Sequence, residues 1–257
     1  MASRVLTKIG LPPAFQFFKA VASHEFRRGA VKTAPFFVHM DPIFQSLLDA
    51  NPWPNITGAT AWNYTLGGGG RQLIDDLITQ HRPAHMLEIG CFLCASTRRW
   101  LSLDPNLKLV GVDPWDDNLI AQCRRYVDRP GLTHAYPERA TQERFAADVE
   151  HQGPFTTAVA NMRGFEGRFV PVRGRSPDVL PGLKDAGLEP GLIYIDAGKN
   201  IDDLEACHSL WPGAILTGDD WHWGRTKGYP MRRIVEAFAE KHDLKITADL
   251  ATWVLTR

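Results

Sequence analysis

Four residues in the last third of the chain have types and spacing that suit metal-assisted acid–base chemistry. Asp196 and Lys199 follow one short apolar run as a D-x-x-K motif, and Asp219 and Asp220 follow the next such run. If the two runs are adjacent parallel strands, about 4.8 Å apart, their carboxylates converge at one edge of a sheet. Acids that close repel one another unless they are protonated or neutralised, and Mg²⁺ prefers oxygen ligands. The pattern predicts Asp196, Asp219 and Asp220 as ligands of a divalent cation.

Capping of the helices that follow these strands is the alternative role for the aspartates, because Asp is a good N-cap residue. Capping explains one aspartate in each loop, but not the adjacent Asp219 and Asp220 opposite a D-x-x-K motif. The metal site is therefore the preferred interpretation. A substrate hydroxyl at the cation would have a lowered pKa, with Lys199 as the candidate base and His222 as the alternative.

A second group of candidate residues follows earlier apolar runs and suits a nucleoside-containing cofactor. Gly90 permits a tight turn and a close approach of the backbone. Asp113 can accept hydrogen bonds from two ribose hydroxyls, and Trp115 can lie against a ring. Arg175 and Ser176 are candidates for contacts with adenine. The predicted cofactor-binding residues are Glu88, Gly90, Cys91, Ser96, Asp113, Trp115, Arg175, Ser176 and Asp196.

Short apolar runs alternate with helical patterns from about residue 65 onward, and this alternation predicts a parallel sheet with right-handed crossovers. The predicted strands are 84–89, 107–112, 168–172, 192–195 and 214–217. The predicted helices are 72–80, 96–103, 118–127, 155–162, 202–210 and 231–242. Residues 244–247 and 252–256 predict a hairpin that adds one antiparallel strand. The long segment between the second and third strands predicts an extra loop or helix at 136–145, near the site.

The acid-x-Gly turn at Glu88 and Gly90, the acid Asp113 about 25 residues later and the closing hairpin resemble class I S-adenosylmethionine-dependent methyltransferases. The resemblance covers roughly residues 65–257. It implies a Rossmann-like, mostly parallel seven-stranded sheet, in which the first turn holds the methionine part of the cofactor and Asp113 binds its ribose. The turn departs from the family pattern, because three other residues stand where further glycines are common: Phe92, Cys94 and Ala95.

The D-x-x-K motif with the later acidic pair resembles the cation-dependent catechol and caffeoyl-coenzyme A O-methyltransferases. This resemblance implies that Asp196, Asp219 and Asp220 hold the metal and that Lys199 deprotonates the hydroxyl. The sequences around Asp113 and Asp219 look more like bacterial sugar and antibiotic O-methyltransferases, which also use a three-acid metal site but often have His in place of Lys199. The implied acceptor is a hydroxyl of a small molecule or sugar, for example one of a vicinal pair.

Two other functions stay open at this point. A metal-independent methyltransferase acting on nitrogen, carbon or a nucleic acid would keep its activity in chelator and tolerate Asp219→Ala. A non-catalytic module would bind S-adenosylmethionine without turnover. A nicotinamide dehydrogenase is disfavoured, because its G-x-G-x-x-G fingerprint places a pyrophosphate on a helix N-terminus, whereas the equivalent stretch here contains only Gly90.

The composition is that of an ordinary globular chain. Of 257 residues 44% are hydrophobic and 23% are charged, and Lys plus Arg equals Asp plus Glu at 29 each, so a nucleic-acid partner is not expected. No apolar run approaches the ~20 residues of a spanning helix, and the N-terminus lacks a secretory h-region. With four cysteines, these features predict a cytoplasmic enzyme. The lone C-x-x-C of Cys91 and Cys94 is interpreted as part of a turn.

Residues 1–65 are rich in aromatic residues, contain prolines and show no clear strand. We predict that they form a helical N-terminal cap or lid over a core at 66–257, with homo-oligomer formation as a further possibility. Five aromatic residues are candidates for a substrate wall, although core packing would account for about half of them. They are Trp62, Tyr64, Trp221, Trp223 and Tyr229.

Overall fold

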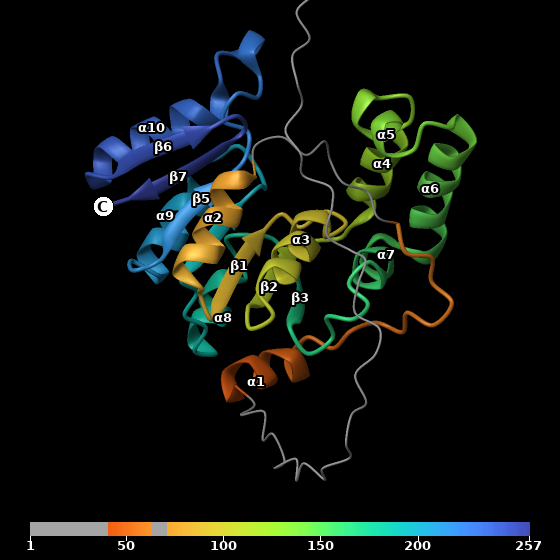
Figure 1. The fold of residues 1–257 in the computed structure, drawn as a ribbon, viewed down its shortest axis with the longest axis horizontal. Coiled ribbons are helices and arrows are strands. Elements are labelled where there is room, and N and C mark those ends of the chain that lie inside the picture. Colours follow the sequence, from red (N-terminus) through yellow and green to blue (C-terminus); the bar gives the residue numbers. More distant parts are fainter. Residues whose placement is uncertain (1–40, 63–70) are drawn as a thin grey trace, which may run out of the picture. The chain divides into compact units, whose positions relative to one another are not determined.

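The computed structural model describes residues 41–62 and 71–257, in which a seven-stranded sheet carries helices on both faces (Figure 1). The strands are β1 His85–Ile89, β2 Lys108–Asp113, β3 Phe169–Arg173, β4 Leu192–Ile195, β5 Ile215–Gly218, β6 Lys245–Asp249 and β7 Thr252–Thr256. Their order is β3-β2-β1-β4-β5-β7-β6. Strands β1 to β5 pair in parallel, whereas β7 is antiparallel to both β5 and β6. This topology confirms the predicted fold class, including the closing hairpin.

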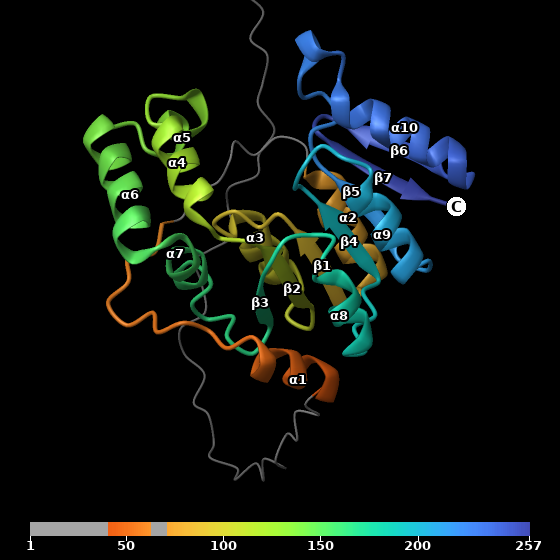
Figure 2. The ribbon, with the colours of Figure 1, turned by 180° about the vertical axis from the view of Figure 1, so that it is seen from behind.

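The helices connect these strands as a doubly wound fold requires. They are α1 Pro42–Ala50, α2 Gln72–His81, α3 Ala95–Leu103, α4 Asp117–Tyr126, α5 Pro130–Ala135, α6 Arg139–Gln152, α7 Pro154–Ala160, α8 Leu180–Asp185, α9 Asp202–Leu210 and α10 Pro230–His242, with a 3₁₀ turn η1 at Arg225–Lys227. Helices α2 and α3 cover the face of the sheet seen in Figure 1, and α8 and α9 cover the face seen in Figure 2.

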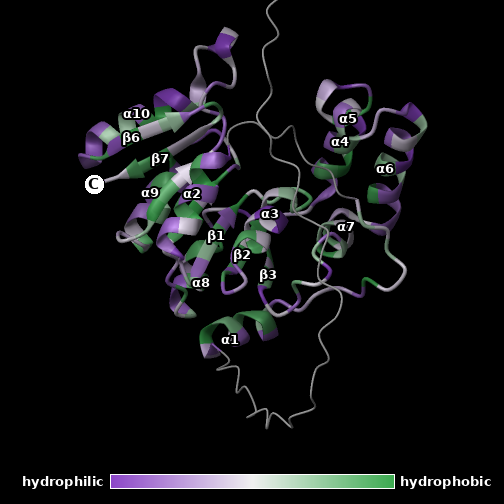
Figure 3. Cartoon of the chain, viewed as in Figure 1, coloured by the Kyte–Doolittle hydropathy of each residue, from purple (hydrophilic) through white to green (hydrophobic). Residues whose placement is uncertain are grey.

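Both faces of the sheet are apolar because both are covered. Successive residues of a strand point to opposite faces, so Leu87 and Ile89 of β1 join one core cluster and Met86 joins the other. The first cluster packs against α1, α8, α9 and α10, and the second packs against α2 to α7. The helices carry hydrophobic and hydrophilic residues side by side, as α6 illustrates (Figure 3).

Three of the predicted strands extend one residue further than the apolar runs that predicted them. Asp113 pairs with Arg173 at the ends of β2 and β3, and Gly218 pairs with Ile195 at the ends of β5 and β4. Backbone hydrogen bonding continues past the last apolar side chain because the ladder uses only main-chain groups. This extension places Asp113 and Gly218 inside the sheet and the next residues at its carboxyl edge.

The long segment between β2 and β3 forms four helices, α4 to α7, which pack on one another. The predicted extra element at 136–145 corresponds to the turn before α6 and the first half of that helix. Gln142 is 1% exposed, and its amide accepts from the N–H of Asp128 and donates to the carbonyl of Tyr136. These bonds fix the turn between α4 and α6. Residues 136–145 do not line the cleft described below.

The described part of the predicted cap begins with α1, whose Phe44 and Leu47 join the first core cluster. At its N-cap, Asp41 contacts His85 and Lys108 at the amino ends of β1 and β2. Although burial opposes the change, hydrogen bonds from the Phe44 N–H, His85 and Lys108 lower the pKa of Asp41 to about 2. Residues 1–40 and 63–70, with Tyr64, lie outside the described residues, so the boundary of the cap stays a prediction.

None of the helices in the described ranges is both long and apolar enough to cross a membrane.

Candidate active site

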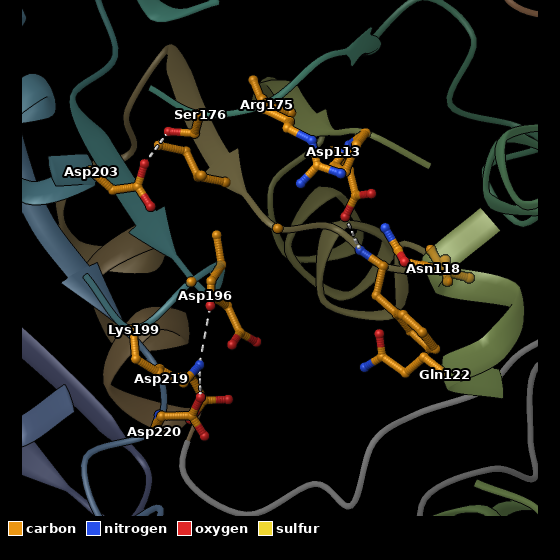
Figure 4. A pocket seen from close by; sticks show the side chains of 18 of the residues that line it. Asp113, Asn118, Gln122, Arg175, Ser176, Asp196, Lys199, Asp203, Asp219 and Asp220 are labelled. Carbon is orange, nitrogen blue, oxygen red and sulfur yellow. Dashed lines mark hydrogen bonds and ion pairs between the residues drawn. The ribbon is translucent and has the colours of Figure 1, made fainter. Parts of the chain in front are cut away.

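A cleft of about 790 Å³ opens beyond the carboxyl ends of β1, β2, β4 and β5, where ligands bind in open α/β sheets. Figure 4 shows side chains from several loops pointing into it. Eight of the predicted site residues line this cleft: Gly90, Asp113, Arg175, Ser176, Asp196, Lys199, Asp219 and Asp220. Five do not line it: Glu88, Cys91, Ser96, Trp115 and His222. The topology thus brings together residues that are up to 130 positions apart in the sequence, from Gly90 to Asp220.

The turn after β1 depends on Gly90, as its sequence predicts. Gly90 has a φ of +89°, and a Cβ there would lie 2.3 Å from the carbonyl oxygen of Asp196. A side chain cannot fit between the ends of β1 and β4. Phe92 and Cys94 also have positive φ values, 50° and 62°. The turn therefore uses the left-handed backbone conformations that favour glycine, although other residues occupy two of those positions.

Asp113 links the turns after β1 and β2. Its carboxylate accepts from the Phe92 N–H at 2.9 Å and from the Trp115 N–H at 2.8 Å, and the first bond is drawn in Figure 4. Burial raises the pKa of Asp113, and the backbone hydrogen bonds oppose that rise. With the Cys91 N–H as a third backbone donor, the carboxylate still keeps acceptor capacity. Asp113 is therefore placed to accept hydroxyl hydrogen bonds from within the cleft.

Trp115 lies on the other side of this loop. It is 1% exposed, its indole N–H donates to the Phe92 carbonyl at 2.6 Å, and its ring packs 5.3 Å from that of Phe155. The side chain belongs to the second core cluster. In the structure, Trp115 stabilises the loop that carries Asp113.

Glu88, Cys91 and Ser96 lie behind the first turn. Glu88 is 0% exposed and accepts a hydrogen bond from the Thr97 hydroxyl. Burial raises the pKa of Glu88 to about 7, while the bonds from Thr97 and Ser96 oppose the rise. Cys91 is a buried thiol that donates weakly to the Glu88 carbonyl at 3.6 Å. These three residues therefore stabilise the turn and do not line the cleft.

Arg175 and Ser176, at the end of β3, both contact acidic residues. Arg175 pairs with Asp116, the N-cap residue of α4, and both residues line the cleft. The Ser176 hydroxyl donates to Asp203 on α9 (Figure 4). Asp203 is 1% exposed, and burial raises the pKa of Asp203.

At the opposite end of the cleft, the three aspartates after β4 and β5 meet two cationic side chains. Arg71 Nη2 lies 3.1 Å from Asp219 Oδ2 and 3.7 Å from Asp196 Oδ2. Lys199 pairs with Asp220 and donates to the Ala197 carbonyl at 3.2 Å (Figure 4). Burial, with the charges of Asp219 and Asp220, raises the pKa of Asp196 to about 8. Arg71 and Lys199 therefore balance the charges of Asp219 and Asp220, while burial favours the protonated form of Asp196.

Close packing holds the second acidic loop in place. A Cβ at Gly218 would lie 2.3 Å from the Trp253 ring and 2.4 Å from the Ile195 carbonyl oxygen. The Trp253 indole N–H donates to the Asp219 carbonyl at 2.9 Å. Asp220 has a φ of +68°, which turns the chain back towards Lys199. Gly218 and Trp253 together fix the position of the two acids.

The donor chemistry of the three aspartates fits a hard divalent cation, because such ions take carboxylate oxygens. Within residues 41–62 and 71–257, however, no three His, Cys, Asp or Glu side chains are grouped as a ready-made metal site. The acids are engaged by Arg71 and Lys199 instead. A cation would have to replace these ion pairs.

Lys199 and His222, the two candidate bases, are placed differently. Lys199 lines the cleft next to the acids, whereas His222 is exposed and its ring is 6.4 Å from that of Tyr229. Among the described members of the predicted aromatic wall, Trp62 and Trp221 are buried, with 5% and 8% exposed. Trp223 is 47% exposed and lines the cleft. Among the described members of this wall, Trp223 is therefore the one best placed to meet an acceptor.

Several residues that line the cleft escaped sequence reasoning: Arg71, Phe92, Asn118, Gln122, Tyr126 and Asp203. For Arg71 a signal exists. The predicted helix 72–80 is joined by a short loop to the predicted strand 84–89, so the two run in opposite directions along the sheet. The amino end of the helix, with Arg71, therefore lies at the carboxyl end of the strand. For Asn118 and Gln122 the i, i+4 spacing on α4 places both on one helix face, but nothing in the sequence shows that this face borders the cleft.

Solved structures with a similar fold include three that were determined with a bound ligand or cofactor. The O-methyltransferase from Bacillus cereus in complex with SAH is 16% identical, with 86% of this chain and 94% of that chain covered and a TM-score of 0.47. TomG, the O-methyltransferase from Streptomyces achromogenes involved in tomaymycin synthesis, in complex with SAM, is 18% identical, with 85% and 97% covered and a TM-score of 0.47. Cofactor-bound Rv0187 from MTB is 20% identical, with 86% and 93% covered and a TM-score of 0.47. Similarity at this level concerns the path of the backbone.

No protein-family model and no curated protein matches the chain.

Proposed function

We propose that this chain transfers a methyl group from S-adenosylmethionine to a hydroxyl of a small molecule or sugar, and that the reaction depends on a divalent cation. The observation that carries the proposal is the composition of one cleft. At one end lies Asp113, an acid suited to a ribose, and at the other end Lys199 lies among Asp196, Asp219 and Asp220. A cofactor site and a site for proton removal thus share one space.

The cofactor end fits S-adenosylmethionine better than a dinucleotide. Asp113 follows β2 and retains acceptor capacity towards the cleft. Gly90 brings the β1 turn against the backbone of Asp196, so a ligand above the turn reaches the acidic end. The single glycine does not provide the cradle that a pyrophosphate requires. When bound, S-adenosylmethionine supplies an electrophilic methyl group on a sulfonium centre.

The acidic end fits the deprotonation of a hydroxyl. We assign proton removal to Lys199 Nζ because it lines the cleft, whereas His222 does not. A cation bound by Asp220 would replace the Lys199–Asp220 ion pair and favour the neutral amine, which would then take the proton of the hydroxyl. Trp223, which lines the same end, would lie against the acceptor. Holding both reactants in one cleft contributes to the rate by orientation.

The proposed cation would be held by Asp196, Asp219 and Asp220, where it would lower the pKa of the acceptor hydroxyl. Burial and neighbouring acids raise the pKa of Asp196 to about 8, so a cation there would compete with a proton for this carboxylate. A second candidate function has its own support. Because Arg71 and Lys199 already pair with these acids, a methyltransferase without a cation requirement is the alternative.

The test combines cofactor titration with methyl transfer. Calorimetry measures S-adenosylmethionine binding to wild type and Asp113→Asn. We expect about tenfold weaker binding in the variant, because one charge-assisted hydrogen bond is worth roughly 1.5–3 kcal/mol. Radiolabelled methyl transfer is then assayed on vicinal phenols and sugars, with Mg²⁺ or with chelator. The variants are Lys199→Met, Asp219→Asn and, as a control, Lys241→Met, whose partner Glu205 does not line the cleft.

The outcomes separate the candidates. Transfer that requires Mg²⁺, fails in Lys199→Met and persists in Lys241→Met supports the full proposal. Transfer that is undiminished in chelator and in Asp219→Asn supports the cation-independent candidate. If well-folded wild type does not bind S-adenosylmethionine, both candidates are wrong.

A further inference from the structure

We propose that Arg71 is a resident counter-cation of the acidic site and sets how tightly this site binds a divalent cation. The inference rests on the proposed function, since it concerns the cation of that site. The inference goes beyond the proposed function because it gives a role to a residue outside both predicted site motifs. Arg71 is a positioning residue here, because it acts through Asp196 and Asp219.

The backbone of Arg71 is firmly placed. Arg71 is the N-cap residue of α2, and its carbonyl accepts from the N–H groups of Ile74 and Asp75, both at 3.1 Å. Ile74 and Ile78 are fully buried and fix this helix on the core. The Arg71 side chain is only 10% exposed. Its guanidinium is therefore held at the carboxyl edge of the sheet, and it does not extend into solvent.

Arg71 uses the same oxygens that a cation would need. Asp219 Oδ1 accepts from the Asp220 N–H at 2.9 Å, so Oδ2 is the oxygen with more capacity left for a cation. That Oδ2 lies 3.1 Å from Arg71 Nη2, and Asp196 Oδ2 lies 3.7 Å from the same nitrogen. A guanidinium does not give up its charge at accessible pH. A divalent ion bound by both aspartates must therefore displace Arg71 or bind against its charge.

The guanidinium is also incompletely held. Arg71 Nε is buried and has no hydrogen-bond partner among the described residues. A buried N–H without an acceptor costs free energy, so this guanidinium is held less firmly than one whose N–H groups are all bonded. Burial acts to lower the pKa of Arg71, whereas the nearby carboxylates of Asp219 and Asp196 act to raise it. Arg71 thus neutralises the acids without completing a closed network, and it can yield to an ion of higher charge.

The experiment measures Mn²⁺ binding to the full chain by calorimetry, without cofactor or acceptor. The proteins are wild type, Arg71→Met, Arg71→Gln and Arg71→Lys, with Arg99→Met as the matched control. Arg99 pairs with Asp75 on the same helix and does not line the cleft. Circular dichroism and S-adenosylmethionine binding check that each variant is folded. Arg71→Gln serves as a second neutral variant if Arg71→Met does not fold.

We expect Mn²⁺ to bind at least about tenfold more tightly to the neutral Arg71 variants, because these variants remove the repulsion of a unit charge only a few ångströms from the ion. Arg71→Lys and Arg99→Met should stay within about threefold of wild type, since the first keeps the charge and the second loses it further away. Equal or weaker binding in both neutral variants overturns the role of Arg71 but leaves the transferase intact. No Mn²⁺ binding in any protein overturns it together with the cation site, whereas cofactor binding and transfer in chelator report on the transferase separately.

Discussion

Glu88 and Tyr194 are paired residues of neighbouring strands β1 and β4, and each has a buried side-chain oxygen without a hydrogen-bond partner among the described residues. Glu88 is fully buried just before the turn that approaches Asp196. Burial raises the pKa of Glu88 from 4.5 to about 7. The pair places incompletely satisfied polar groups inside an otherwise apolar core, and their protonation and removal should have measurable effects on stability.

Replacing Glu88 by Gln should change how stability depends on pH. Glu88 has a higher pKa in the folded chain than in the unfolded chain, so the folded state binds more protons between about pH 4.5 and 7. Its contribution to stability is present below pH 4.5 and is lost as the pH rises to about 7, a total of about 3 kcal/mol. Urea unfolding of wild type and Glu88→Gln at pH 5 and pH 8 measures this contribution to the free energy of unfolding. Relative to wild type, Glu88→Gln should be more stable at pH 8 than at pH 5, and a difference that does not change with pH would contradict the assignment.

Replacing Tyr194 by Phe should leave stability unchanged or raise it by up to about 1 kcal/mol, because the hydroxyl that is removed is buried and unpaired. Thr217→Val is the matched control. It removes a buried hydroxyl that donates to the Ile193 carbonyl at 2.9 Å, and it should cost about 1 kcal/mol. Chemical unfolding at one pH compares the two variants. Clear destabilisation by Tyr194→Phe would mean that the hydroxyl has a partner, such as an ordered water.

Replacing Gly90 by Ala should disrupt the fold around the site more than backbone strain alone can explain. Gly90 and Gly164 have nearly the same φ, +89° and +91°, but a Cβ at Gly164 meets nothing within 4 Å. Gly164→Ala should cost about 1 kcal/mol from its positive φ. Gly90→Ala should cost about 2 kcal/mol more, since its Cβ would overlap the Asp196 carbonyl. Thermal unfolding gives the difference, and equal losses would show that the β1 turn moves away freely.

The sequence was sufficient for the fold because hydrophobic periodicity and strand–helix alternation agree along most of the core. Strand β4 and helix α9 begin and end where the apolar patterns predict. The six-residue helix α8 was not predicted, since a Pro and a Gly within so short a segment leave no clear period. The ends of β2 and β5 were placed one residue early, because pairing continues through Asp113 and Gly218 without apolar side chains.

The site could be predicted only where side chains directly follow strands. Asp113, Asp196 and Asp219 were found because the carboxyl edge of a parallel sheet gathers such residues. Arg71 was missed although the direction of α2 places its backbone at this edge, because the path of its long side chain to the aspartates depends on packing. Trp115 was predicted to face the cleft, but it packs in the core. Sequence position gives the loop, whereas the direction of a side chain depends on packing on both sides of that loop.

Trp223 should determine how well an aromatic acceptor is bound. Its ring is 47% exposed and lies 5.8 Å from Lys199 Nζ and 5.3 Å from Lys227 Nζ. We expect Trp223→Ala to raise KM for a phenolic acceptor about tenfold, because one stacked ring contributes roughly 0.5–1.5 kcal/mol beyond the apolar area it covers. Stability should change by less than about 0.5 kcal/mol, as is usual for exposed residues.

Steady-state kinetics with a phenol and with a sugar acceptor make this prediction specific to Trp223. Trp223→Phe should restore most of the affinity for the phenol, and the effect on the sugar should be smaller, because a sugar offers no planar face to stack on the ring. Leu103→Ala is the control for loss of an exposed apolar side chain, since Leu103 is 44% exposed and does not line the cleft. A fall in kcat with unchanged KM would mean that Trp223 acts by positioning Lys199 and does not contact the acceptor.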